Sequence, residues 1–198
     1  MSQLKSLVLA AALLIATTAG ALADVEGALK ALRAGDNKEA LSQFTKLSKA
    51  KNPDAEYWLG HMYVEGIGVK QDVPKGVKLM TKAADQGLVI AMRDLGQIYM
   101  RGDGVLQDYA KAFKRLQAAA HQNDAISQRL LGELYANGWG VDADPVWAYV
   151  WYDYAAKNHD KDALALRANL VQTMSTSEIT QGEKLAQTIK GQIFGQDG

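Results

Sequence analysis

The chain has 198 residues, of which 22 are lysine or arginine and 22 are aspartate or glutamate, so its formal net charge is zero. Balanced charge argues against binding to nucleic acid or to an anionic membrane, because both partners select a strongly basic face. The absence of cysteine excludes disulfides and thiolate metal sites, and the length is sufficient for one domain with a substantial core.

The N-terminal segment has the pattern of a secretory signal peptide. Lys5 precedes an apolar run from Leu7 to Ala16, and Ala21-Leu22-Ala23 matches the small-residue pattern of a cleavage site. The run is far shorter than the roughly 20 apolar residues that a membrane-spanning helix needs. We therefore expect residues 1–23 to be cleaved and the mature chain to be periplasmic or secreted, with no membrane insertion after cleavage.

Residues 24–54 are predicted to form an N-terminal capping pair of helices. Apolar residues recur one helical turn apart from Ala28 to Leu47, and Gly35-Asp36 interrupts them. A polar connection of this kind separates two helices that pack against each other.

The next part of the chain is an internal repeat of 36 residues. When residues 55–90, 91–126 and 127–162 are aligned without gaps, nine columns are identical in all three units. These columns are Leu59/Leu95/Leu131, Gly60/Gly96/Gly132, Tyr63/Tyr99/Tyr135, Gly66/Gly102/Gly138, Gly68/Gly104/Gly140, Val69/Val105/Val141, Asp72/Asp108/Asp144, Ala83/Ala119/Ala155 and Ala84/Ala120/Ala156. A fixed period of this length is typical of a repeat architecture.

Each unit predicts two helices joined by a glycine-containing turn. In the first unit Leu59 and Tyr63 lie one turn apart, so they share a helix face. Gly60 lies inside that helix, where glycine costs about 1 kcal/mol relative to alanine, and we expect it to admit a closely packed neighbour. Gly66 is placed to end the helix in a left-handed conformation, and Asp72 is placed to cap a second helix.

The pattern L-G-x-x-Y-x-x-G-x-G-V-x-x-D with a later Ala-Ala pair resembles the SEL-1-like repeat family over residues 55–162. The resemblance implies an all-α fold, a right-handed superhelical α/α solenoid of three helix-turn-helix repeats related to tetratricopeptide repeats. Residues 163–198 are predicted to be C-terminal capping helices and a tail, with a capping box at Ser175 and Glu178. We expect Trp147 and Trp151 to pack between the third unit and these terminal helices.

Residues suited to acid–base or metal chemistry do not form a recognisable set. His61, His121 and His159 fall at different positions of their units, without metal-ligand spacing. Ser48-Lys49-Ala50-Lys51 matches a nucleophile motif of penicillin-interacting enzymes, but the companion motifs are missing from the sequence. We therefore predict no enzyme activity, no metal and no cofactor.

The first helix of each unit supplies the candidate partner-binding residues. Its third, seventh and eleventh positions form a line away from the leucine–tyrosine stripe. The line comprises Tyr57, His61 and Glu65, then Arg93, Gln97 and Arg101, then Arg129, Glu133 and Asn137. It predicts a polar groove with a basic centre for an extended acidic or polar peptide; the alternative is a solvated helix face. Trp58 and Trp139 lie outside the shared columns and are candidate aromatic anchors.

Members of the SEL-1-like family commonly scaffold complexes, including envelope-stress signalling, polysaccharide-export and flagellar assemblies. The resemblance implies a periplasmic adaptor or regulator that binds another exported protein in the concave groove, and we expect it to be monomeric. The alternatives are a secreted effector that binds a host protein and an envelope enzyme that acts on cell-wall material or binds β-lactams.

Overall fold

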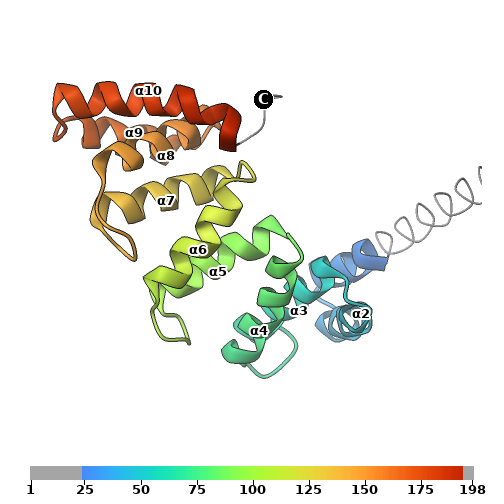
Figure 1. The fold of residues 1–198 in the computed structure, drawn as a ribbon. Coiled ribbons are helices and arrows are strands. Elements are labelled where there is room, and N and C mark those ends of the chain that lie inside the picture. Colours follow the sequence, from blue (N-terminus) through green and yellow to red (C-terminus); the bar gives the residue numbers. More distant parts are fainter. Residues whose placement is uncertain (1–23, 194–198) are drawn as a thin grey trace, which may run out of the picture. The chain divides into compact units, whose positions relative to one another are not determined.

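The computed structural model describes residues 24–193, all of whose regular elements are helices (Figure 1). The signal peptide predicted for residues 1–23 lies outside the described residues. The described chain divides into two compact units, one ending at Leu88 and the other beginning at Val89. The all-α fold class predicted from the sequence is confirmed.

The first unit is built from two helical hairpins. A helix over residues 24–33 precedes α2 (Asn37–Lys49), α3 (Pro53–Glu65) and α4 (Val73–Asp85). Phe44 and Met62 are fully buried in the core that α2 and α3 share. Gly66 ends α3 with φ at 71°, the left-handed conformation predicted for it.

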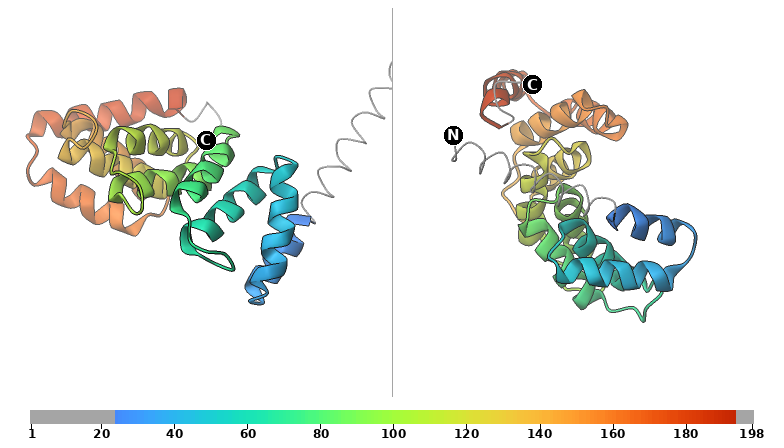
Figure 2. Two further views of the ribbon diagram at one scale, coloured as in Figure 1. Left: turned by 90° about the horizontal axis from the view of Figure 1, so that it is seen from below. Right: turned by 90° about the vertical axis from the view of Figure 1, so that its right-hand side faces the viewer.

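The second unit contains the remaining described helices. They are α5 (Val89–Arg101), α6 (Tyr109–Ala120), α7 (Ala125–Asn137), α8 (Pro145–Lys157), α9 (Lys161–Val171) and α10 (Thr176–Ile193). Leu116, Leu131 and Leu134 are fully buried in its core. Both C-terminal helices contact α8, and Figure 2 shows α9 and α10 on either side of it.

Capping side chains set the starts of the second helix of each repeat. Asp72, Asp108 and Asp144 accept backbone N–H groups of α4, α6 and α8 at 3.0, 2.9 and 2.9 Å. The predicted capping box is also present, since the Ser175 N–H donates to the Glu178 carboxylate at 2.7 Å and the Glu178 N–H donates to the Ser175 hydroxyl at 3.3 Å. Local sequence therefore determines where these helices begin.

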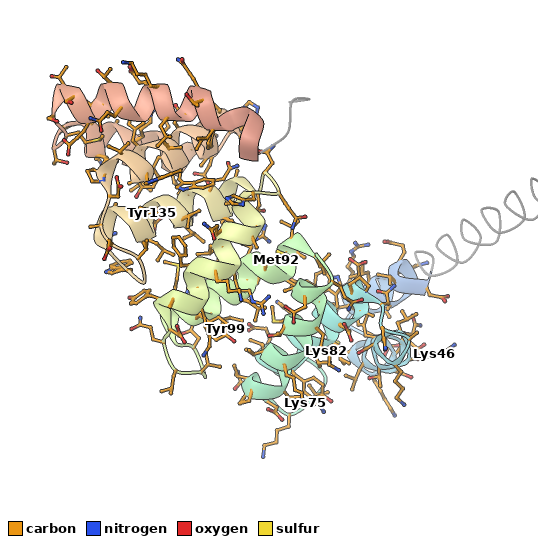
Figure 3. The ribbon with its side chains drawn as sticks, viewed as in Figure 1. Lys46, Lys75, Lys82, Met92, Tyr99 and Tyr135 are labelled. Carbon is orange, nitrogen blue, oxygen red and sulfur yellow. The ribbon has the colours of Figure 1, made fainter. Side chains whose placement is uncertain are left out.

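The tryptophans of α8 join a core shared with α10, as predicted, and they also pack against the preceding helices. Trp151 is 2 % exposed and stacks on His121 at the end of α6, with ring centroids 5.6 Å apart. Trp147 stacks on Tyr135 of α7 at 6.0 Å (Figure 3 labels Tyr135). Both rings thus contact the preceding helices, and buried residues of α10 belong to the same core.

Candidate protein-binding surface

The predicted binding residues of the first unit belong largely to an aromatic cluster on α3. Tyr57 is 4 % exposed and packs edge-on against Trp58 at 5.2 Å between ring centroids. Trp58 is half-buried, because it stacks on Phe44 of α2. His61 is also half-buried, and its Nδ1 has no hydrogen-bond partner among the described residues. Tyr57 is therefore a core residue, while Trp58 and His61 expose only part of their rings.

The arginines predicted as a basic centre form ion pairs within the second unit. Arg93 of α5 lies 3.2 Å from Asp124, the N-cap of α7. Arg129 of α7 lies 3.1 Å from Asp160, the N-cap of α9, and 2.7 Å from Glu133. Each aspartate caps its own helix with its other oxygen, which accepts a backbone N–H at 2.8 Å. The predicted basic centre is therefore neutralised by carboxylates of the chain itself.

The electrostatic balance keeps both arginines charged. Burial by itself would lower the pKa of Arg93 and of Arg129, but the neighbouring carboxylates outweigh burial and raise both pKa values. The main role of the two pairs is thus to tie α5 to α7 and α7 to α9. Sequence reasoning missed them, although an arginine and an aspartate 31 residues apart occur in two successive repeats.

A polar surface remains accessible on the two linked first helices. Arg101 is exposed, donates to Gln97 at 3.1 Å and lies 3.8 Å from Asp103. Asn137 donates to the backbone carbonyl of Glu133 at 2.8 Å. We call Gln97, Arg101, Glu133 and Asn137 the α5/α7 face. This face presents hydrogen-bond donors and acceptors, together with one positively charged and one negatively charged side chain.

Two apolar side chains are exposed in the loops of the second unit. Trp139 is 39 % exposed and stacks on Tyr109, with ring centroids 5.3 Å apart and planes inclined by 22°. Gln107 donates to the Tyr109 hydroxyl at 3.0 Å, which helps to hold that ring. Leu106 is 91 % exposed. Trp139 is thus held by stacking on Tyr109 and remains accessible to a partner.

The Sel1 repeat family model matches residues 53–88, 89–124 and 125–160. The chain belongs to the Sel1 repeat family. The matched segments keep the 36-residue period and begin at Pro53, Val89 and Ala125, each the first residue of a helix. They lie two residues before the units aligned from the sequence.

Two solved structures are similar to this Sel1 repeat protein. A Sel1 repeat protein from Oxalobacter formigenes is 31 % identical, with a TM-score of 0.70, over 76 % of this chain and 45 % of that chain. A protective antigen of uropathogenic Escherichia coli strains, which displays an SLR fold, is 30 % identical, with a TM-score of 0.70, over 76 % of this chain and 32 % of that chain. This chain thus spans less than half the length of either. No curated protein matches it.

Sel1 repeat proteins generally mediate protein–protein interactions and are typically non-enzymatic. Among the described residues, no group of three or more histidine, aspartate and glutamate side chains is arranged to hold a metal ion. His121 and His159 lie at the ends of α6 and α8, and Ser48 lies near the end of α2. None of the described helices has the length and apolar character needed to cross a membrane.

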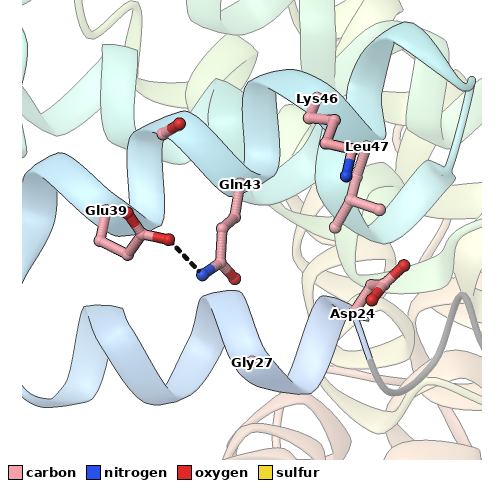
Figure 4. A pocket seen from close by; sticks show the side chains of 7 residues that line it. Asp24, Gly27, Glu39, Gln43, Lys46 and Leu47 are labelled. Atoms are coloured by element: carbon pink, nitrogen blue, oxygen red, sulfur yellow. Dashed lines mark hydrogen bonds between the residues drawn. The ribbon is translucent and has the colours of Figure 1, made fainter.

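A hollow of about 510 Å³ lies between the helix over residues 24–33 and α2 (Figure 4). Within it, Gln43 donates to the Glu39 carboxylate at 2.6 Å. The other lining residues are Asp24, Gly27, Ser42, Lys46 and Leu47. The lining is polar or charged apart from Gly27 and Leu47.

Proposed function

We propose that this Sel1 repeat protein is an exported adaptor of the bacterial cell envelope that binds another exported protein on the α5/α7 face. One observation carries the proposal. The residues that recur in every repeat build and cap the helical hairpins, whereas the side chains of the α5/α7 face differ between repeats and remain accessible.

The recurring residues are used for packing. Leu95 and Leu131 are fully buried, and the paired alanines Ala119 and Ala120 are also fully buried. A partner therefore meets the variable positions of the first helices. Variation between successive repeats supports specific binding. If the repeats had identical surfaces, a partner could bind equally well after a shift by one repeat.

The chemistry of the α5/α7 face supports a polar peptide segment with both charges as the bound element. Gln97 and Asn137 carry amide groups, Arg101 carries a positive charge, and the Glu133 carboxylate is partly neutralised by Arg129. Since the nearby arginines are already paired, a strongly acidic peptide gains less here than the sequence predicted. Trp139 is the aromatic side chain that we assign as a hydrophobic anchor.

Export is supported by the signal-peptide pattern of residues 1–23. Cell fractionation combined with N-terminal sequencing tests it. We expect a mature chain that begins at Asp24 in the periplasmic fraction. Release of that chain into the medium would favour the secreted effector instead, and a full-length cytoplasmic protein would overturn export.

Photo-crosslinking in cells tests the binding surface. A photoreactive amino acid at position 97 is expected to give one dominant adduct with an envelope protein, identified by mass spectrometry. The matched control places the same group at Lys114, an exposed position on α6. The same adduct from both positions, or none from position 97, would remove the α5/α7 face from the proposal.

A further inference from the structure

One side of α2 carries three exposed lysines, Lys38, Lys46 and Lys49, of which Lys46 also borders the hollow next to the helix over residues 24–33. Their spacings of eight and three residues place them on one face of the helix. The opposite side of α2 holds the buried residues Ala40 and Phe44. Figure 3 shows Lys46 on this side of α2.

Three further residues of α2 lie beside these lysines, and they are Leu41, Ser42 and Thr45. We call these six residues the α2 lysine face. It combines three positive charges with two hydroxyl groups and one half-buried apolar side chain, which is the mixed chemistry of a protein-binding surface.

The charge of this face has no partner inside the described chain. None of its three lysines forms an ion pair with a described residue. Glu39, on the same helix, instead accepts the amide of Gln43 (Figure 4). This differs from the second unit, where Arg93 and Arg129 are paired internally. The α2 lysine face is therefore complementary to an external anionic group.

Helix stability explains the positions of only two of these three lysines. Lys46 and Lys49 lie in the last turn of α2, where positive charge interacts favourably with the helix dipole. Lys38 lies in the first turn, where the same dipole disfavours a positive charge. The position of Lys38 in the first turn therefore favours a role in binding over a role in helix stability.

We propose that the α2 lysine face binds an acidic helical segment of a partner protein. Because a helix rises about 1.5 Å per residue, Lys38 and Lys46 are spaced about 12 Å apart along α2, and Lys46 and Lys49 about 4.5 Å apart. A partner helix lying along α2 matches them with carboxylates at the same intervals and places an apolar residue over Leu41. This interaction is independent of the α5/α7 face, which belongs to the other unit.

An anionic membrane fits this face less well. Electrostatic attachment to a bilayer uses clusters of about four to eight basic residues, more than the α2 lysine face provides. An acidic helix, in contrast, also engages Leu41 and the two hydroxyl groups. Membrane binding is therefore a competing outcome of the test.

The test is a fluorescence-polarisation titration of the purified protein with a labelled helical peptide. The peptide carries glutamate at positions 1, 9 and 12 of the contact and leucine at position 4, intervals taken from α2. We expect the triple variant K38Q/K46Q/K49Q to bind about tenfold or more weakly. The matched control K70Q/K78Q/K82Q removes three other exposed lysines of the first unit and is expected to bind like the unsubstituted protein.

Several outcomes would overturn the proposal. They are no binding of the peptide, equal weakening by both triple variants, or equal binding of a peptide with the same composition and rearranged glutamates. A different result is that the protein fails to bind the peptide but sediments with phosphatidylglycerol vesicles in a way that requires Lys38. That result would assign the face to a membrane. Matching thermal unfolding of the two triple variants establishes that both are folded.

Discussion

The hairpin α3/α4 is packed more closely than the hairpins α5/α6 and α7/α8. A Cβ on Gly60 would lie 2.8 Å from the backbone oxygen of Gly76, and a Cβ on Gly76 would lie 2.6 Å from that of Gly60. The residues equivalent to Gly76 in the other hairpins are Ala112 and Ala148, which are fully buried. The helices α3 and α4 thus meet backbone to backbone, whereas the other pairs accommodate a Cβ at this position.

In the second unit only side-chain atoms lie nearest to the recurring glycine, whereas a Cβ on Gly60 would meet the side chain of Met80 at 2.7 Å as well as the backbone oxygen of Gly76. A Cβ on Gly96 would lie 2.5 Å from Leu116, and one on Gly132 would lie 2.6 Å from the ring of Tyr152. This unit also ties successive repeats with arginine–aspartate pairs. One sequence column therefore serves a fixed backbone contact in one hairpin and an adjustable side-chain contact in another, and the predictions below test that difference.

The largest expected effect is that of Gly60→Ala. We expect it to lower the free energy of unfolding by about 3 kcal/mol, because the added methyl group meets a backbone oxygen that cannot move away. Gly96→Ala is the matched control. It should cost less, about 1 to 2 kcal/mol, since the buried side chain of Leu116 can shift more readily than a backbone oxygen and alanine favours the helix. Urea unfolding of both variants measures the difference, and equal losses would contradict the comparison.

The next effect concerns the polar ties of the second unit. Asp124→Ala removes the N-cap of α7 and leaves Arg93 with fewer carboxylate neighbours, so we expect a loss of about 2 kcal/mol. Asp124→Asn keeps the capping oxygen and should lose about 1 kcal/mol or less. Thermal unfolding compares the two, and a loss with asparagine as large as with alanine would show that the cap contributes little.

The contact between α8 and α10 predicts loss of stability in alkali. The Tyr154 hydroxyl donates to the carbonyl of Ala186 at 2.6 Å, and burial raises the pKa of Tyr154 to about 12. The pKa of tyrosine in the unfolded chain is about 10. The contribution of the neutral Tyr154 hydroxyl to the free energy of unfolding is therefore complete below pH 10 and is lost as the pH rises from about 10 to about 12. Tyr154→Phe should cost about 1 kcal/mol at neutral pH and weaken the alkaline dependence. An unchanged pH profile would refute the assignment.

The smallest effect is a titration at the end of α6. Burial lowers the pKa of His121, which stacks on Trp151. The neutral form therefore stabilises the fold above the unfolded pKa of about 6.5, and this small contribution is lost as the pH falls below that value. Protonation should quench tryptophan fluorescence with a midpoint below 6.5, and His121→Gln should abolish the transition. A midpoint above 6.5 would show that burial does not control this histidine.

Local chemistry made much of the fold predictable. Residue types and spacing predict a helix end at Gly66 and a helix start at Asp72, and the structure confirms both. The close approach expected at Gly60 is also confirmed. The candidate site was less predictable, since the same spacing argument placed the buried Tyr57 in one line with the exposed Arg101.

The sequence by itself determined the repeat period, the capping residues and the family, because caps, left-handed turns and helical periodicity act over a few residues. Tertiary structure alone decided that Arg93 pairs with Asp124, that Tyr57 is buried and that the lysines of α2 have no partner among the described residues. These outcomes depend on which helices pack together. Charge pairing and burial arise between residues distant in the chain, so no local pattern specifies them.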